Sequence, residues 1–167
     1  MKMKLISIVV ILISLLCCAS EAGTATADQP NFTGTWKIER ALSDAPALRD
    51  VDKLTYVISY TAPEMRVVRF IKEKKQAERT SELVYYTDGR GEKISFLFGH
   101  DKWRSKTTWV GNTLVSKFPT DSRNYKETWS MSADGKMLTV VTEITGNAFN
   151  RDRVRPESYH KVFRKIA

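Results

Sequence analysis

Short strand-like segments separated by turn residues dominate this chain from Thr33 onward. Each segment is rich in β-branched and aromatic residues, and turn signals return about every eight to twelve positions, as in antiparallel sandwiches and barrels. Ten strands in one small domain favour closure of the sheet, because a closed barrel leaves no unpaired edge. We predict strands near 34–40, 54–60, 65–72, 80–87, 93–98, 102–110, 113–118, 124–131, 137–145 and 157–164.

Turn residues indicate how these strands connect. Asp88-Gly89, Gly111-Asn112 and Asp134-Gly135 supply the positive backbone angles of tight hairpins, so we expect strands adjacent in sequence to be adjacent in space. The segment 72–79 (KEKKQAER) has almost no apolar face, which favours a solvated hairpin end over a helix. In 41–52, apolar residues at roughly helical spacing predict one short helix or lid after the first strand.

The N-terminus has the pattern of an export signal. Lys2 and Lys4 precede an uncharged apolar run over 5–16, which is too short to span a bilayer. Ala25-Thr26-Ala27 has small residues where signal peptidase cuts, so we expect residues 1–27 to be a signal peptide and 28–167 to form one domain. This predicts a periplasmic or secreted protein.

Two cysteines leave a second interpretation of this segment open. Cys17 and Cys18 follow the apolar run, where a lipoprotein signal also places its modified cysteine, although the residues just before them are not the usual small ones. In both interpretations the folded domain has no cysteine, so no disulfide stabilises it.

Several motifs resemble those of secreted bacterial lipocalin-like domains, which are calycin barrels related to fatty-acid-binding proteins. They occur in the expected order as Asn31-Phe32-Thr33-Gly34-Thr35-Trp36-Lys37, Trp109-Val110-Gly111-Asn112-Thr113-Leu114-Val115, Glu127-Thr128-Trp129-Ser130-Met131-Ser132 and Ala133-Asp134-Gly135-Lys136-Met137-Leu138-Thr139-Val140, followed by a strand over 159–165. The resemblance implies an all-β fold: a single antiparallel up-and-down barrel of eight to ten strands.

The resemblance also implies how the barrel closes. The Trp of the Gly-x-Trp motif packs against a basic residue of the last strand in such barrels, and Gly34, Trp36 and Arg164 match these positions. The Thr-Asp-Tyr motif and the cysteines of typical lipocalins are absent, so a ten-stranded form similar to fatty-acid-binding proteins fits at least as well as an eight-stranded one.

Strand alternation identifies candidate cavity residues, because every second side chain shares a face. The candidates combine aromatic and polar groups, which suits either a ligand cavity or a packed interior with polar ends. They are Tyr56, Arg69, Trp103, Trp109, Tyr125, Glu127 and Trp129.

Arg69 is the candidate with the most open interpretation. It alternates with Met65, Val67 and Ile71, and an inward arginine is costly unless it is paired. It could bind a ligand carboxylate or pair with Glu127 or Glu143; alternatively, Val68 and Phe70 mark the inner face and Arg69 is solvated.

No pattern of catalytic or metal-binding residues appears in the sequence. His100 and His160 stand at no ligand spacing, so we expect no enzyme activity, metal or cofactor. We expect a monomeric barrel that binds a small hydrophobic or amphipathic molecule. The alternative is an envelope-interaction or inhibitor protein that uses basic clusters at 72–79 and 151–155 on anionic surfaces; export argues against nucleic acid.

Overall fold

Ten antiparallel strands form one sheet in the computed structural model, which describes residues 29–93, 104–146 and 155–166. The strands are β1 (Gly34–Ile38), β2 (Val51–Thr61), β3 (Glu64–Glu73), β4 (Arg79–Tyr86), β5 (Glu92–Lys93), β6 (Arg104–Val110), β7 (Thr113–Pro119), β8 (Arg123–Met131), β9 (Met137–Gly146) and β10 (Glu157–Lys165). Two single-turn 3-10 helices, η1 (Arg40–Leu42) and η2 (Pro46–Leu48), follow β1. In the described part of the chain, no helix is long and apolar enough to span a membrane.

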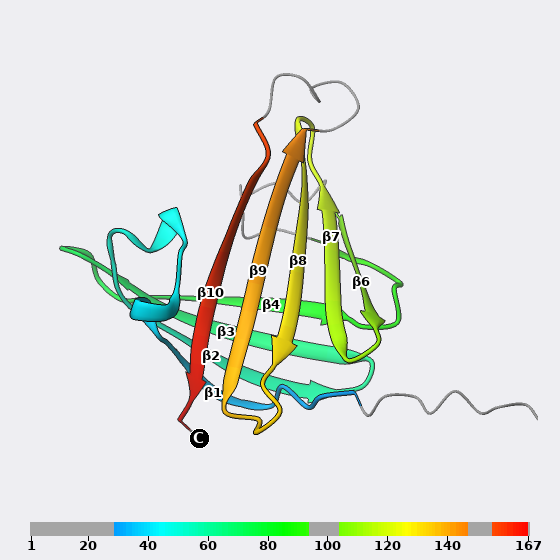
Figure 1. Cartoon of the computed structure of the whole chain (residues 1–167), viewed down its shortest axis with the longest axis horizontal. Coiled ribbons are helices and arrows are strands. Elements are labelled where there is room, and N and C mark those ends of the chain that lie inside the picture. Colours follow the sequence, from blue (N-terminus) through cyan, green and yellow to red (C-terminus); the bar gives the residue numbers. More distant parts are fainter. Residues whose placement is uncertain (1–28, 94–103, 147–154, 167) are drawn as a thin grey trace, which may run out of the picture.

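The first and last strands of the chain pair, which joins its two halves in one sheet. Its order is β4-β3-β2-β1-β10-β9-β8-β7-β6-β5, so β1 lies between β2 and β10. Trp36 stands opposite Lys165, and Lys37 stands opposite Arg164. In Figure 1 the strands β6 to β10 stand upright in front, while β1 to β4 cross behind them. The predicted up-and-down barrel is confirmed, with ten strands.

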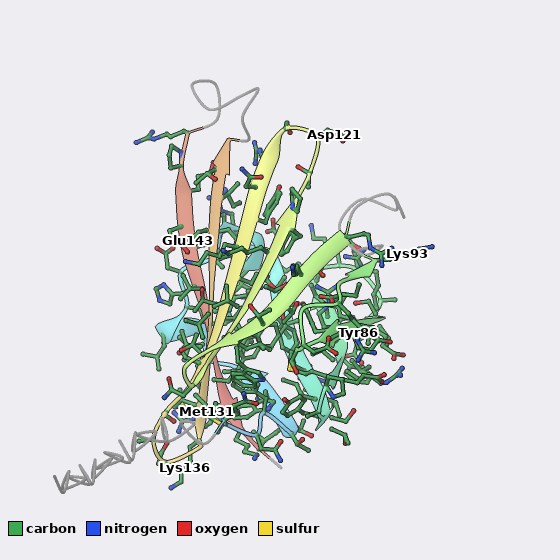
Figure 2. All side chains as sticks on the ribbon, turned by 90° about the vertical axis from the view of Figure 1, so that its right-hand side faces the viewer. Tyr86, Lys93, Asp121, Met131, Lys136 and Glu143 are labelled. Carbon is green, nitrogen blue, oxygen red and sulfur yellow. The ribbon has the colours of Figure 1, made fainter. Side chains whose placement is uncertain are left out.

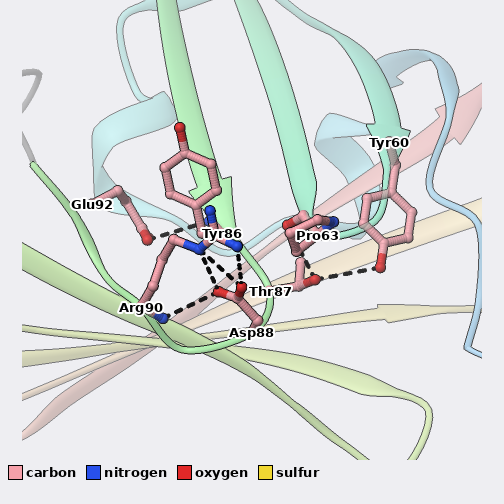
Figure 3. Close-up of polar contacts among 7 residues, drawn as sticks. All are labelled: Tyr60, Pro63, Tyr86, Thr87, Asp88, Arg90 and Glu92. Atoms are coloured by element: carbon pink, nitrogen blue, oxygen red, sulfur yellow. Dashed lines mark hydrogen bonds and ion pairs between the residues drawn. The ribbon is translucent and has the colours of Figure 1, made fainter.

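A seam between β4 and β5 is the one junction of this sheet without a strand ladder in the described residues. The predicted turn at Asp88-Gly89 forms, with Gly89 at φ +77°, but it does not join two paired strands. Instead, Asp88 bridges to Thr108 of β6, and the backbone N–H of Tyr86 donates to Glu92 Oε2 at 3.3 Å (Figure 3). Of the strand predicted at 93–98, residues 94–98 lie outside the described residues.

The segment after β1 differs from the predicted single helix. Asp44 and His160 of β10 exchange two backbone hydrogen bonds of 3.0 and 2.9 Å, which hold the chain extended between η1 and η2. Pro46 then begins the second turn, and Val51 already belongs to β2. The pairing with β10 therefore splits a helix-like pattern into two short turns.

Alternating side chains of the strands form the buried interior. Trp36, Phe32, Met65, Val67 and Phe163 are fully buried, and the inward residues of β2 share the same core. The turn over 74–78 between β3 and β4 is exposed, which confirms the solvated hairpin end predicted for 72–79. Burial of these side chains is the main source of stability in a domain whose described part contains no cysteine.

The basic residue that packs against the Trp36 ring is Lys165 and not the predicted Arg164. The Trp36 indole is fully buried and donates to the Phe32 carbonyl at 2.8 Å, but Arg164 points away from it and donates to Glu39 Oε1 at 2.7 Å. Lys165 takes the predicted place of Arg164 beside the ring. Phe163 faces inward, so alternation puts Lys165 on the inner side of β10 and Arg164 on the outer side.

Candidate functional site

A pocket opens beside η2, between β2, β3, β4 and β10. Its volume is about 380 Å³, and its lining combines apolar and basic side chains. Its lining residues are Leu48, Leu54, Tyr56, Arg69, Ile71, Arg79, Thr80, Ser81 and Lys161. Residues from the start, the middle and the end of the domain thus meet at this pocket, which we call the mouth pocket.

Arg69 lies on the inner face of β3, as the first two of its three interpretations require. Met65 and Val67 on the same face are fully buried, so Val68 and Phe70 do not mark the inner face of this strand. The Arg69 guanidinium donates from Nε and Nη2 to Ser81 Oγ on β4, at 3.0 and 2.9 Å. Glu143 lies on the outer face, where it pairs with Lys126 at 2.6 Å, and is therefore not a partner for Arg69.

Lys161 is a site residue that the sequence analysis missed. Only 16% of its side chain is exposed, and its Nζ lies 4.0 Å from Glu127 Oε1. Burial opposes the charge, but attraction to Tyr56, Glu127 and Tyr159 outweighs it and raises the pKa of Lys161 above its ordinary value. The ammonium is therefore charged at neutral pH. Its inward position follows from alternation with Phe163, so the periodicity of β10 could have identified it.

A row of polar side chains crosses the interior behind the mouth pocket. Glu127 is buried and accepts from Thr142 Oγ1 at 3.4 Å, while Thr107 Oγ1 and Ser116 Oγ lie 2.9 Å apart. Glu92 is also buried and accepts from the hydroxyls of Thr107, at 2.8 Å, and Ser105. The row reaches from β5 to β9, so one side of the interior is polar.

Aromatic side chains face this polar row. Trp129 lies 6.1 Å from Tyr56 and 5.6 Å from Tyr85, measured between ring centroids. Burial, followed by the nearby Glu127 and Tyr56, raises the pKa of Tyr85 well above its ordinary value, so its hydroxyl stays neutral. Among the described side chains, Trp129 Nε1 is the one buried nitrogen or oxygen without a hydrogen-bond partner.

Of the described cavity candidates, Tyr56 and Arg69 line the mouth pocket, whereas Trp109, Tyr125, Glu127 and Trp129 do not. Trp109 stacks on Phe32 at 5.6 Å and donates to the Tyr60 hydroxyl at 3.2 Å, within the packed core near Trp36. The Tyr60 hydroxyl in turn contacts Thr87 Oγ1 at 3.4 Å (Figure 3). Tyr125 stacks on Phe118 at 5.0 Å, and Trp103 lies outside the described residues. The interior is therefore packed around Trp36 and hollow at the mouth pocket.

Of the two basic clusters predicted from sequence, only the first lies fully within the described residues. In the first, Arg79 pairs with Glu73 at 2.5 Å, and Lys74 lies 3.9 Å from Asp50, so nearby carboxylates offset part of its charge. The second, at 151–155, falls almost entirely outside the described residues, as do His100 and the N-terminal segment. His160 contacts the Leu42 carbonyl at 3.1 Å, and the described residues contain no group of three or more potential metal ligands.

Comparison with solved structures places the fold among calycin barrels of the fatty-acid-binding type. The chain aligns with the fluorescent protein UnaG over 81% of its length and 97% of that protein, with 15% identity and a TM-score of 0.54. The alignment with fatty-acid-binding protein 1 of Echinococcus granulosus covers 81% of this chain and 98% of that protein, with 11% identity and a TM-score of 0.55. The alignment with the zebrafish ileal bile acid-binding protein, complexed with cholic acid, covers 81% of this chain and 98% of that protein, with 15% identity and a TM-score of 0.54.

These alignments cover nearly the whole length of each compared protein, so the likeness concerns the entire barrel. No protein-family model and no curated protein sequence matches the chain. The fold predicted from the Gly-x-Trp resemblance is confirmed, and identities this low support a statement about the fold alone.

Proposed function

We propose that this protein binds a small amphipathic molecule with an acidic end, which enters at the mouth pocket. The observation that carries the proposal is the convergence of Arg69, Arg79 and Lys161 on a pocket that Leu48 and Leu54 also line. An apolar chain would pack on the leucines, while a carboxylate would accept hydrogen bonds from the cations.

Carboxylates accompany two of the three cations that line the pocket. Glu73 pairs with Arg79 at 2.5 Å, and Glu127 Oε1 lies 4.0 Å from Lys161 Nζ. Arg69 reaches the pocket with its guanidinium oriented by Ser81, so little side-chain freedom is lost when it binds a ligand oxygen.

Two further observations support an occupant in the interior. Trp129 Nε1 is a buried donor that the described residues leave without an acceptor, and such a group gains when a ligand oxygen reaches it. The compared proteins include fatty-acid-binding proteins and a bile acid-binding protein, whose names describe acidic amphipathic ligands. Residues 1–27 support export, so we propose that this binding takes place outside the cytoplasm.

Displacement of a fluorescent apolar probe by oleate and by oleyl alcohol tests the proposal. These two ligands share a chain and differ in the acidic end, so oleate should bind more tightly. Changing Arg69→Met or Lys161→Met should weaken oleate binding about tenfold or more and affect oleyl alcohol little, because charge-assisted hydrogen bonds are lost only with the acid.

Arg66→Met is the matched control, because Arg66 lies three residues before Arg69 on β3 but faces outward, where it pairs with Glu64 at 2.8 Å. It should leave oleate binding unchanged. If neither oleate nor cholate displaces the probe saturably, the proposed function is wrong. If both ligands bind equally well to wild type and to the two pocket variants, the acidic preference is wrong.

A further inference from the structure

Five basic residues gather on the outer face of β5 to β8, away from the mouth pocket. They occupy outward positions, because Ser105, Thr107, Ser116 and Glu127 on the same strands are buried inside. We call this surface the basic face. It consists of Lys93, Arg104, Lys106, Lys117 and Lys126.

Strand register sets these cations directly opposite one another. Lys106 stands opposite Lys117, and Lys117 stands opposite Lys126, so three lysines form a row across three strands. Lys93 and Arg104 form a second like-charged pair, two residues from Lys106 along β6. Like charges directly opposite one another in a sheet lower its stability.

Carboxylates compensate little of this charge. The row ends at Glu143 of β9, which stands opposite Lys126 and pairs with it at 2.6 Å. Lys93, Arg104, Lys106 and Lys117 have no carboxylate within ion-pair distance in the part of the chain that the structure describes. Figure 2 looks onto this side of the barrel, with Lys93 at one margin of the basic face and Glu143 at the other.

The shape of the basic face distinguishes among anionic partners. Its cations spread over two rows on a sheet rather than along a channel. A groove of about 390 Å³ lies beside Lys117 and Lys126, and most of its lining belongs to outward positions of β7, β8 and β9. Phe118 and Tyr125 line this groove but stack on each other from inner positions. The outward residues of β6 to β8 are Lys, Arg, Thr, Val, Ser, Asn and Pro, so the outer face itself has no row of aromatic rings for stacking bases.

From this arrangement we infer that the basic face docks the barrel on an anionic phospholipid bilayer. A bilayer presents phosphate groups in a plane, so it can meet both rows of cations at once. Attraction to lipid phosphates also offsets the mutual repulsion of the opposed lysines, which within the described barrel only Glu143 reduces, at one end of the row. This docking depends on the outer surface and is independent of any ligand in the mouth pocket.

Vesicle flotation tests the inference on the purified protein with its N-terminal segment as cells produce it. We expect wild type to float with phosphatidylcholine vesicles that contain phosphatidylglycerol, to remain behind with pure phosphatidylcholine, and to be released by high salt. The triple variant Lys106→Gln/Lys117→Gln/Lys126→Gln should bind the anionic vesicles about a hundredfold more weakly, since each lysine near such a surface contributes about fivefold.

A second triple variant controls for net charge. Lys37→Gln/Lys75→Gln/Lys136→Gln removes three exposed lysines outside the basic face and should float like wild type. All three proteins share one N-terminal segment, so its own affinity for lipid is common to them. Thermal unfolding of the first triple variant should occur at the same or a higher temperature, because it loses like-charge repulsion.

Three outcomes overturn the inference. The first is that wild type does not float with anionic vesicles. The second is that both triple variants float as wild type does. The third is that wild type binds soluble dextran sulfate through the three lysines while it ignores the vesicles, which assigns the basic face to a linear polyanion instead.

Discussion

The Lys165 ammonium lies 5.4 Å from the centroid of the Trp36 ring, across the pairing of β1 with β10. These residues stand at opposite ends of the described chain and face each other in register. Their contact lies over the indole where the first and last strands pair. This pair of side chains therefore marks where the two ends of the chain meet in one sheet.

Replacing Trp36 should destabilise the barrel strongly. Trp36→Ala removes a fully buried indole and its hydrogen bond to the Phe32 carbonyl, so we expect a loss of about 3 to 5 kcal/mol in the free energy of unfolding. Denaturant melts of the variant and wild type measure this difference.

Lys165→Ala and Arg164→Ala provide the comparison within the same closure. Lys165→Ala should cost about 0.5 to 1 kcal/mol, the range for an exposed cation over an aromatic ring. Arg164→Ala should cost about 1 kcal/mol or less, because its pair with Glu39 is largely solvated. A Trp36→Ala variant within about 0.5 kcal/mol of wild type would contradict the closure.

Replacing Glu92 should weaken the seam. Its carboxylate accepts from Ser105, Thr107 and the backbone N–H of Tyr86, and so connects β5 with β6 and with the end of β4. Glu92→Ala leaves these donors without their acceptor, and we expect a loss of about 2 to 4 kcal/mol in the free energy of unfolding. Glu78→Ala removes an exposed partner of Lys53 and should cost about 0.5 kcal/mol or less. Equal denaturant midpoints for the two variants would show that the buried carboxylate does not stabilise the seam.

Alkaline pH should destabilise the protein partly through Tyr85. Burial raises the pKa of Tyr85 in the folded state, so above pH 10 the unfolded chain releases this proton while the folded protein retains it. Stability is then fully present below the ordinary tyrosine pKa and falls as pH rises above it. Denaturant melts at a series of pH values should show a shallower alkaline decline in Tyr85→Phe than in wild type.

Tyr86→Phe is the control for this titration. Tyr86 is the next residue on β4, but its ring faces outward, 5.0 Å from the guanidinium carbon of Arg90. The alkaline decline of Tyr86→Phe should be steeper than that of Tyr85→Phe. If the two variants decline equally, burial of the Tyr85 hydroxyl does not contribute to the pH dependence.

Alanine substitutions at Gly91 and Gly135 distinguish the cost of backbone strain from the cost of a steric clash. Gly91 has φ +83°, and a Cβ there would lie 2.9 Å from the Ser105 carbonyl oxygen, whereas Gly135 has φ +69° and open space around it. Gly135→Ala should cost about 1 kcal/mol from strain alone, and Gly91→Ala should cost at least about 1 kcal/mol more. Thermal and denaturant melts of both variants measure the difference. If the Gly91→Ala variant loses no more stability than the Gly135→Ala variant, the close approach of Gly91 to β6 is not a constraint.

Much of the barrel could be predicted from local sequence patterns. Alternation over two residues places Tyr56 and Glu127 among the inner faces, and turn residues such as Gly111 and Gly135 mark where strands reverse. Both signals act within a few residues, so they are present in the unfolded chain as well as in the folded one. The Gly-x-Trp motif, with its order of later motifs, also indicated that the first and last strands meet.

Only the tertiary structure decided which side chains from distant strands lie together. Arg69, Arg79 and Lys161 belong to three strands, and the row formed by Lys106, Lys117 and Lys126 depends on the register of three more. A shift of one residue in any of these pairings would send the side chains to the opposite face. The split of the predicted helix by Asp44 and His160 has the same origin, because those residues pair only when β10 is in place. Alternation sets the face on which a side chain lies, whereas barrel closure and strand register set its neighbours.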